Sequence, residues 1–217
     1  MTDRVGWVLV VPLKRLDQAK SRLGPPYEDR RRDLALAFAL DTAAAALATP
    51  SVTGVLVVTD EPVAARLLTG LGAWIVADEP RAGLNPALGH GARLAAARHP
   101  GCGTGALSAD LPALRPGELE VALVRAIDSG TQRCFVRDAS GTGTTLALAR
   151  PGVTLEPQFG ADSATEHSRA GHADVTGEDV PSVRLDVDTA ADLEAARRLG
   201  VGPHTAAVLH EARAAAR

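Results

Sequence analysis

Residues 6–23 read GWVLVVPLKRLDQAKSRL, an apolar run that passes directly into a polar, basic loop. The apolar part, residues 6–13, is typical of a parallel β-strand covered on both faces, because a half-exposed strand would alternate apolar and polar side chains. In open parallel sheets, ligands bind beyond the carboxyl ends of the strands. The loop that starts at Lys14 therefore lies where a binding site is expected.

The rest of the chain alternates between strand-like and helix-like runs. Further strands are predicted at 52–59, 73–77, 104–108, 133–137, 144–149 and 182–187. Helices are predicted at 28–48, 62–71, 86–98, within 159–170, and at 189–199 and 204–216. The β-α-β-α order of the first half predicts parallel strands joined by right-handed crossovers. We therefore expect one α/β domain over residues 1–217, a three-layer α/β/α, Rossmann-like fold with a mixed, mostly parallel sheet.

The composition excludes several classes of protein. Of the 217 residues, 23% are charged and 46% are hydrophobic, which is unlike a disordered chain. The net charge is -3 and the lysines and arginines are scattered, so we expect no nucleic-acid partner. Two cysteines, Cys102 and Cys134, suit a reducing compartment. No apolar run approaches the roughly 20 residues that span a bilayer, so we expect a cytoplasmic protein without a membrane partner.

Four cations fall within nine residues after the first strand: Lys14, Arg15, Lys20 and Arg22. A basic loop that leads into a helix suits phosphate groups, because mobile cations, backbone N–H groups and the helix dipole converge there. The G-x-x-x-x-G-K-[ST] pattern of a Walker loop is missing. A solvated, positively charged turn would look the same by composition, and that alternative stays open.

Three aspartates form the counterpart of the basic loop. Asp110 follows one predicted strand, and Asp186 and Asp188 end another with the period-two spacing that places both side chains on one side. Such carboxylates can hold Mg²⁺, which prefers oxygen ligands and bridges to substrate phosphates. Two structural alternatives remain: Asp188 could cap the helix that begins near residue 190, and Asp110 could merely end its strand.

Two hydroxyl-rich turns supply further candidates. Residues 141–145 read GTGTT and open a strand, and residues 159–163 read FGADS ahead of a helix. Free N–H groups and Ser163 suit a phosphate or carboxylate, although a plain hairpin turn and a plain helix cap would look similar. Together, the basic loop and the acids suggest phosphoryl or nucleotidyl transfer, in which a protein mainly positions reactants and neutralises charge. We interpret the six histidines as surface or packing residues, because they form no zinc pattern.

Six segments together resemble a known family. They are residues 11–23 (VPLKRLDQAKSRL), 83–88 (GLNPAL), 107–112 (LSADLP), 141–145 (GTGTT), Phe159-Gly160 with Ser163, and 186–189 (DVDT). In this order they are similar to the guanylyltransferases that activate a phosphoacid for the biosynthesis of the deazaflavin coenzyme F-420. Members act on 2-phospho-L-lactate or phosphoenolpyruvate, and the resemblance implies their nucleotide-diphospho-sugar transferase fold.

The resemblance also implies roles for individual residues. The implied ligands of Mg²⁺ are Asp110, Asp186 and Asp188, and the implied contacts of the phosphoacid acceptor are Thr145, Gly160 and Ser163. The implied GTP-binding residues are Pro12, Lys14, Lys20, Arg22 and Asn85, with Lys20 and Asp110 as the catalytic residues. In the implied reaction, a phosphate oxygen of the acceptor attacks the α-phosphorus of GTP and pyrophosphate leaves.

Three alternatives remain. One is another nucleotidyltransferase of the same fold that uses CTP or acts on a sugar phosphate or molybdopterin; residues 12–14, Pro-Leu-Lys, replace the glycine loop of such enzymes. Another is a metal-dependent glycosyltransferase, whose Asp-x-Asp motif usually lies earlier in the chain. The third is a nucleotide-binding module without catalysis. By analogy with the bacterial branch we expect phosphoenolpyruvate as the acceptor, and the alanine-rich C-terminal helix leaves a homodimer open.

Overall fold

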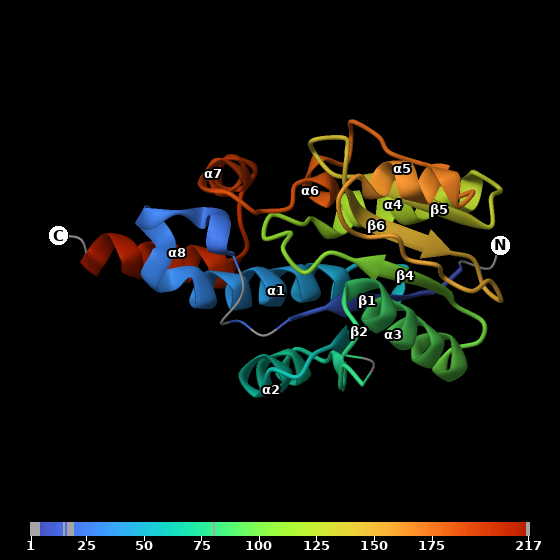
Figure 1. Ribbon diagram of the computed structural model, residues 1–217, viewed down its shortest axis with the longest axis horizontal. Helices are drawn as coiled ribbons and strands as arrows, with labels where there is room; N and C mark the ends of the chain where they lie inside the picture. The colour runs from blue at the N-terminus through green and yellow to red at the C-terminus, as the bar shows by residue number, and fades with distance from the viewer. Residues whose placement is uncertain (1–4, 15, 17–19, 80, 216–217) are drawn as a thin grey trace.

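One mixed β-sheet forms the middle layer of the protein, and helices cover both of its faces (Figure 1). The computed structural model describes residues 5–14, 16, 20–79 and 81–215. Within these residues the sheet has seven strands in the order β3-β2-β1-β4-β6-β5-β7. They are β1 (Trp7–Pro12), β2 (Val52–Val58), β3 (Trp74–Val76), β4 (Gly103–Leu107), β5 (Arg133–Arg137), β6 (Thr144–Ala149) and β7 (Ala173–Asp174). Strand β6 pairs antiparallel with β4 and β5, and the other pairs are parallel, so the predicted mixed, mostly parallel sheet is confirmed.

The helical elements connect these strands and follow the last of them. They are η2 (Ser21–Leu23), η3 (Pro25–Arg30), α1 (Arg31–Leu47), α2 (Pro62–Gly70), α3 (Leu84–Arg98), α4 (Pro116–Asp128), α5 (Ser163–Arg169), α6 (Pro181–Arg184), α7 (Ala190–Leu199) and α8 (Pro203–Ala215). Alanine and leucine dominate α1, whereas valine dominates β1 and β2, as the intrinsic preferences of these residues predict. Among the described residues, we find no helix with the length and apolar character needed to cross a membrane.

The first strand supplies both halves of the hydrophobic core. Leu9 and Val11 pack on the face covered by α1 and α4, and Val8 and Val10 pack on the face covered by α3. This alternation explains why the strand is apolar throughout. On the α3 face, Gly91 allows close approach, because a Cβ there would lie 2.6 Å from Val10 Cγ1. The close packing fixes the start of α3 beside the carboxyl end of β1.

The segment before the two C-terminal acids differs from the prediction. The predicted strand at 182–187 is wrong: the chain forms the short helix α6, and residues 185–188 belong to no strand or helix. The burial of Val183, Leu185 and Val187 at alternate positions imitates a strand pattern. A proline at the start of α6 favours a helical turn instead. Val187 still lies beyond the carboxyl end of β4, because its N–H donates to the carbonyl of Asp110 at 3.0 Å.

Apart from the short helices η2, η3 and α6, two elements have no counterpart in the sequence prediction. Helix α4 carries buried Leu119, Ala122, Leu123 and Ala126, a spacing typical of a helix that the prediction overlooked. Strand β7 has two residues, which is too short to give a periodic pattern. Both lie on the half of the sheet that contains the antiparallel strand β6, away from the regular β-α-β-α part of the chain.

Candidate active site

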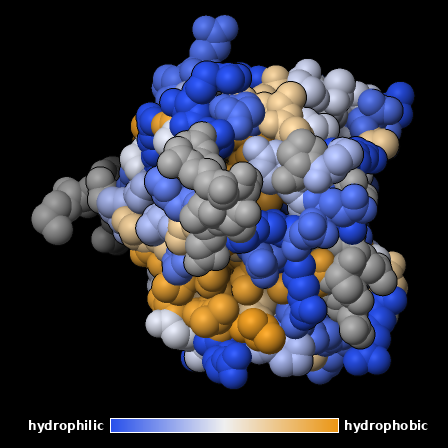
Figure 2. All heavy atoms as spheres, turned by 90° about the vertical axis from the view of Figure 1, so that its left-hand side faces the viewer, coloured by the Kyte–Doolittle hydropathy of each residue, from blue (hydrophilic) through white to orange (hydrophobic). Residues whose placement is uncertain are grey.

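Two connected hollows open at the carboxyl ends of the central strands. The larger, of about 610 Å³, lies beyond β1 and β4, with Lys20, Asp110, Phe159, Gly160 and Asp188 among its lining residues. The second, of about 390 Å³, lies beyond β1, β2 and β3. The hollows share the lining residues Pro12, Leu13, Lys14 and Leu84. In the view onto this end of the molecule, hydrophilic side chains predominate in the upper part and on the right, and a hydrophobic patch lies in the lower part (Figure 2).

A lysine joins two of the predicted acids in the larger hollow. The Nζ atom of Lys20 donates to a carboxylate oxygen of Asp110 and, at 2.9 Å, to Oδ1 of Asp188. Only 11% of the Lys20 side chain is exposed. Burial acts to lower the pKa of Lys20, but the two carboxylates outweigh it and raise the pKa above its usual value. The side chain is therefore a cation held between Asp110, beyond the end of β4, and Asp188, in the segment before α7.

The third predicted acid lies in the same cluster. Burial, followed by the charges of Asp110, Asp188 and Asp138, raises the pKa of Asp186 to about 7. The structure therefore brings the three acids together although the predicted strand is absent, because Val187 is bonded to Asp110. The capping alternative for Asp188 is wrong, since Thr189 is the N-cap of α7 in a capping box with Asp192.

The acids form a donor set without a preformed metal site. Among the described residues, no group of three or more His, Cys, Asp and Glu side chains is arranged to hold an ion. The Lys20 ammonium lies between Asp110 and Asp188 instead. Three clustered carboxylates nevertheless carry more negative charge than one lysine neutralises, and oxygen ligands alone suit a hard cation such as Mg²⁺. By the chemistry of their donor atoms, these residues fit that ion.

The basic loop is only partly described. Lys14 is exposed and lines both hollows, and Arg22 Nη1 lies 3.9 Å from Asp188 Oδ2. Arg15, the fourth predicted cation, lies outside the described residues. The described cations thus border the cavity on the side of β1 and η2.

The predicted acceptor residues gather on the opposite side of the cavity. Gly160 lines the larger hollow, whereas Thr145 and Ser163 are buried behind it. The hydroxyl of Thr145 has no hydrogen-bond partner among the residues that the structure describes. Ala164 N–H donates to the Thr142 carbonyl at 3.0 Å, so the two hydroxyl-rich turns are joined.

His167, which the sequence pattern indicates only as a surface or packing residue, is buried and connects these turns. His167 Nε2 accepts the N–H of Gln158 at 3.0 Å, and Nδ1 lies 2.9 Å from the Ser163 carbonyl and 3.1 Å from Thr144 Oγ1. Because Nε2 accepts, we infer that the proton is on Nδ1 and is donated to Ser163. Burial lowers the pKa of His167, which favours this neutral form. Its i, i+4 spacing from Ser163 was the available sequence signal.

The side chain of Asn85 bonds to the backbone of Phe159 and lines neither hollow. Its Nδ2 donates to the Phe159 carbonyl at 2.9 Å, and its Oδ1 accepts the Phe159 N–H at 2.8 Å. The side chain therefore ties the start of α3 to the residue before Gly160. The predicted contact of Asn85 with GTP stays a prediction.

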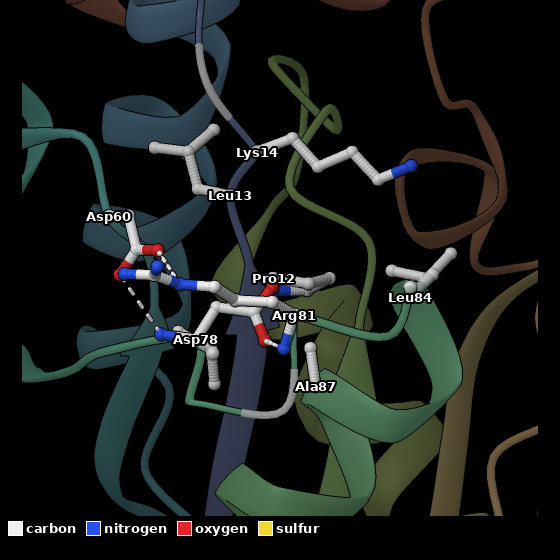
Figure 3. A pocket seen from close by; sticks show the side chains of 10 residues that line it. Pro12, Leu13, Lys14, Asp60, Asp78, Arg81, Leu84 and Ala87 are labelled. Atoms are coloured by element: carbon white, nitrogen blue, oxygen red, sulfur yellow. Dashed lines mark hydrogen bonds and ion pairs between the residues drawn. The ribbon is translucent and has the colours of Figure 1, made fainter.

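Three charged residues of the smaller hollow were not predicted. Asp60 follows β2, Asp78 follows β3, and Arg81 lies in the loop before α3. Figure 3 shows Asp60 paired with Arg81 at one side of this hollow and the Lys14 ammonium at the other. The rule that singled out Asp110, an acid at a strand end, would also have found both aspartates.

This topology, with cations and acids gathered beyond β1 and β4, defines a nucleotidyltransferase-like α/β protein. A Desulfovibrio desulfuricans crystal structure that carries the name nucleotide-diphospho-sugar transferase matches with a TM-score of 0.69 at 17% identity, covering 97% of this chain and 96% of that one. A nucleotidyl transferase from Methanothermobacter matches with a TM-score of 0.61 at 17% identity, covering 89% and 97%. These likenesses confirm the predicted fold class.

The chain belongs to the phosphoenolpyruvate guanylyltransferase family. It is 52% identical over 202 residues to the protein of that name from Thermomonospora curvata, covering 93% of this chain and 88% of the relative. It is 54% identical over 205 residues to the Streptomyces coelicolor protein of the same name, covering 93% and 95%. No protein-family model matches the chain. The protein is therefore a guanylyltransferase, and the family predicted from the six segments is confirmed.

Proposed function

We propose that this protein transfers GMP from GTP to phosphoenolpyruvate and releases pyrophosphate. The observation that carries the proposal is the Lys20–Asp110–Asp188 cluster in the larger of two connected hollows. One hollow can take the nucleotide and the other the acceptor, with the reacting phosphates between them. The names of the relatives support this choice of nucleotide and acceptor.

The proposed reaction is an in-line displacement at phosphorus. A phosphate oxygen of the acceptor attacks the α-phosphorus of GTP, a new phosphoanhydride bond forms, and the bond between the α-phosphorus and the bridging oxygen breaks. Pyrophosphate leaves with the electron pair of that bond. No general base is needed, because a phosphate is already ionised at neutral pH. Binding and charge neutralisation are then the main tasks of the protein.

The basic residues perform the neutralisation. Lys14 borders both hollows, so its ammonium group can pair with a triphosphate that extends from one hollow into the other. Lys20, now bound to two carboxylates, is close enough to exchange them for phosphate oxygens. Gly160 and the buried turn behind it lie on the other side of the cavity, where they suit the acceptor.

We also propose Mg²⁺ as the cofactor, with Asp110, Asp186 and Asp188 as the residues that would hold it. When bound, the ion would offset negative charge on the phosphates. After burial, the charges of Asp110 and Asp188 contribute to the raised pKa of Asp186, so the three carboxylates are close enough to repel one another and to attract a cation.

The acceptor is the least constrained part of the proposal. 2-Phospho-L-lactate has the same phosphate and carboxylate groups as phosphoenolpyruvate, and it is the alternative acceptor. Either product would be an activated phosphoacid of the kind used to build coenzyme F-420. The competing function is a nucleotidyltransferase that uses CTP or a sugar phosphate.

One panel assay tests these choices. Purified protein is incubated with GTP or CTP, with each of phosphoenolpyruvate, 2-phospho-L-lactate and 3-phosphoglycerate, and with Mg²⁺ or EDTA. We expect pyrophosphate release with GTP, phosphoenolpyruvate and Mg²⁺ together, and the guanylylated product in the mass spectrum. Turnover with CTP, or undiminished turnover in EDTA, would contradict the nucleotide or the cofactor. No pyrophosphate in any combination would indicate a binding module.

A variant tests the acceptor side. Ser163 is buried at the start of α5, beside the turn that contains Gly160. Ser163→Ala should raise the KM for the acceptor more than the KM for GTP. An equal rise of both would remove Ser163 from the acceptor pocket.

A further inference from the structure

The smaller hollow combines apolar walls with a charged end. Pro12, Val58, Leu84 and Ala87 supply apolar surface, and Asp60, Asp78 and Arg81 supply hydrogen-bonding groups (Figure 3). A volume of about 390 Å³ is within the range of small-molecule sites. Flat apolar rings with a polar edge, such as nucleobases, match this combination.

The charges decide which end of a nucleotide fits there. The carboxylates of Asp60 and Asp78 would repel a triphosphate, whereas Lys14, which lines both hollows, and Lys20 and Arg22, which line the larger one, would attract it. A nucleotide whose α-phosphate lies near Asp110 therefore places its base in the smaller hollow. This orientation rests on the proposed function.

The two carboxylates differ in how much of their bonding capacity is used. Asp60 is occupied on both oxygens: Oδ1 accepts the Asp78 N–H at 3.2 Å, and Oδ2 lies 3.4 Å from Arg81 Nε. Asp78 Oδ1 accepts the Arg81 N–H at 3.2 Å. Asp78 Oδ2 has no hydrogen-bond or ion-pair partner among the residues that the structure describes. Asp60 is thus an anchor for its neighbours, and Asp78 retains acceptor capacity for a ligand.

Guanine is the common base that offers two adjacent donors, N1–H and the exocyclic 2-amino group. A carboxylate can accept both, in a charge-assisted pair of hydrogen bonds. Adenine and cytosine present an unprotonated ring nitrogen at the corresponding edge, which a carboxylate would repel. Arg81 adds a donor that suits the O6 or N7 acceptors of guanine.

We propose that Asp78 selects guanine by accepting hydrogen bonds from N1–H and the 2-amino group. Asp60 holds Asp78 and Arg81 in position for this contact. Asp78 is therefore a specificity-determining residue, distinct from the phosphate-binding lysines and from the acid cluster around Asp110.

Nucleotide analogues test the proposal directly, with kcat/KM measured at saturating acceptor. Inosine triphosphate lacks the 2-amino group and should react about tenfold more slowly than GTP with the unaltered protein. Xanthosine triphosphate carries a carbonyl at that position and should react more slowly still. Similar rates for the three nucleotides would overturn the proposal without any variant, so it stays falsifiable even if a variant does not fold.

The decisive variant is Asp78→Asn, whose amide can donate to the 2-carbonyl of xanthine. We expect kcat/KM for GTP to fall about tenfold to a hundredfold and the value for xanthosine triphosphate to rise at least tenfold. The neighbouring carboxylate Glu79 provides the control, because Glu79→Gln removes the same charge from an exposed side chain that does not line the smaller hollow. The control should keep the nucleotide preference of the parent.

The outcomes separate this inference from the proposed function. If Asp78→Asn lowered the rates for GTP, inosine and xanthosine triphosphates equally, Asp78 would contact the ribose or only support the fold, and the proposal would fall. If the unaltered protein turned over no guanine nucleotide at all, the proposed function would fail first. Asp60→Asn should lower the GTP rate without a gain for xanthosine triphosphate, and such a gain would reassign the selecting carboxylate.

Discussion

The proposed acceptor side and the proposed nucleotide side of the cavity are held by different interactions. Behind the acceptor side, Asn85 and His167 fix residues 158 and 159 through neutral hydrogen bonds of 2.8–3.0 Å. On the nucleotide side, ion pairs dominate: Lys20 with Asp110 and Asp188, and the exposed Arg81 with Asp60. One side is therefore fixed by neutral, partly buried hydrogen bonds, and the other by charges that a nucleotide can replace.

This contrast fits the order of events in the proposed reaction. A buried neutral network keeps its geometry whether or not a ligand is present, which prepares a site for a small acceptor. Charged side chains paired near a cavity surface can instead change partners when phosphates arrive. We infer that the nucleotide side adjusts on binding and the acceptor side does not.

The largest expected effect comes from removing a charge of the shared cluster. Asp110→Asn keeps the shape of the side chain but leaves Lys20 with one carboxylate partner and removes a proposed metal ligand. We expect kcat to fall by about a thousandfold while the fold survives, as when a group that stabilises charge in a transition state is lost. Pyrophosphate release and the thermal unfolding temperature provide the two measurements.

The matched control is Asp128→Asn, an exposed carboxylate at the end of α4 that is remote from the cluster. It should leave kcat unchanged. Full activity in Asp110→Asn, with an unchanged dependence on Mg²⁺ concentration, would show that Asp110 is not part of the active site. It would also contradict the inference that ion pairs around Lys20 hold the nucleotide side.

The neutral side should be sensitive to acid, because buried His172 packs against His167 with ring centroids 5.0 Å apart. Burial, then the neighbouring His167 and Arg133, lowers the pKa of His172 from 6.5 to about 4. Stability from this group is complete above pH 6.5 and is lost as the pH falls toward 4, because only the unfolded chain then binds the proton. The difference corresponds to about 3 kcal/mol at pH 4. Below about pH 4 both states are protonated and no further loss follows from His172.

Urea unfolding at pH 7 and pH 5 measures this effect. His172→Phe retains a ring beside His167 and cannot be protonated, so its unfolding midpoint should change less between the two pH values than that of the parent. The exposed His210→Phe controls for the loss of a histidine elsewhere. An equal pH response in parent and His172→Phe would show that the buried ring does not limit stability in acid.

Loss of the hydrogen bonds between Asn85 and Phe159 should have a smaller effect on activity. Asn85→Ala removes both hydrogen bonds to Phe159 and loosens the backbone before Gly160. We expect the KM for the acceptor to rise about tenfold, since each bond contributes about 1 kcal/mol. The KM for GTP should change much less. If the KM for GTP rose more, Asn85 would contact the nucleotide, as the sequence resemblance implies, and the division between the two sides would need to be redrawn.

The sequence predicts the charged side better than the neutral one, for a physical reason. Strand ends are visible as apolar runs, so Lys20, Asp110, Asp186 and Asp188 can be placed at one edge of the sheet before the structure is known. Even the wrong strand at 182–187 leaves the acids correctly gathered, because buried Val187 still bonds to Asp110. The acid positions thus depend on burial more than on the type of element.

The neutral network leaves no such pattern. His167 acts through three separate segments, and Asn85 pairs with the backbone of a residue 74 positions away. Backbone partners have no residue type to recognise, so these bonds appear only when the fold is known. Asp60 and Asp78 differ from these residues, because they closely follow β2 and β3 and their positions after apolar runs are visible in the sequence.

The smallest effect should come from Arg22, which tests whether the charges on the nucleotide side are exchangeable. Its side chain is 78% exposed and its nitrogen lies 3.9 Å from Asp188, a distance at which an exposed ion pair contributes at most about 1 kcal/mol. Arg22→Gln should therefore leave the unfolding temperature unchanged and raise the KM for GTP about threefold at low salt. Because the screening length falls to about 3 Å at 1 M salt, the variant and the parent should then show the same KM. A larger effect that persists in high salt would mean that Arg22 makes a fixed, desolvated contact, and the nucleotide side would then be as rigid as the acceptor side.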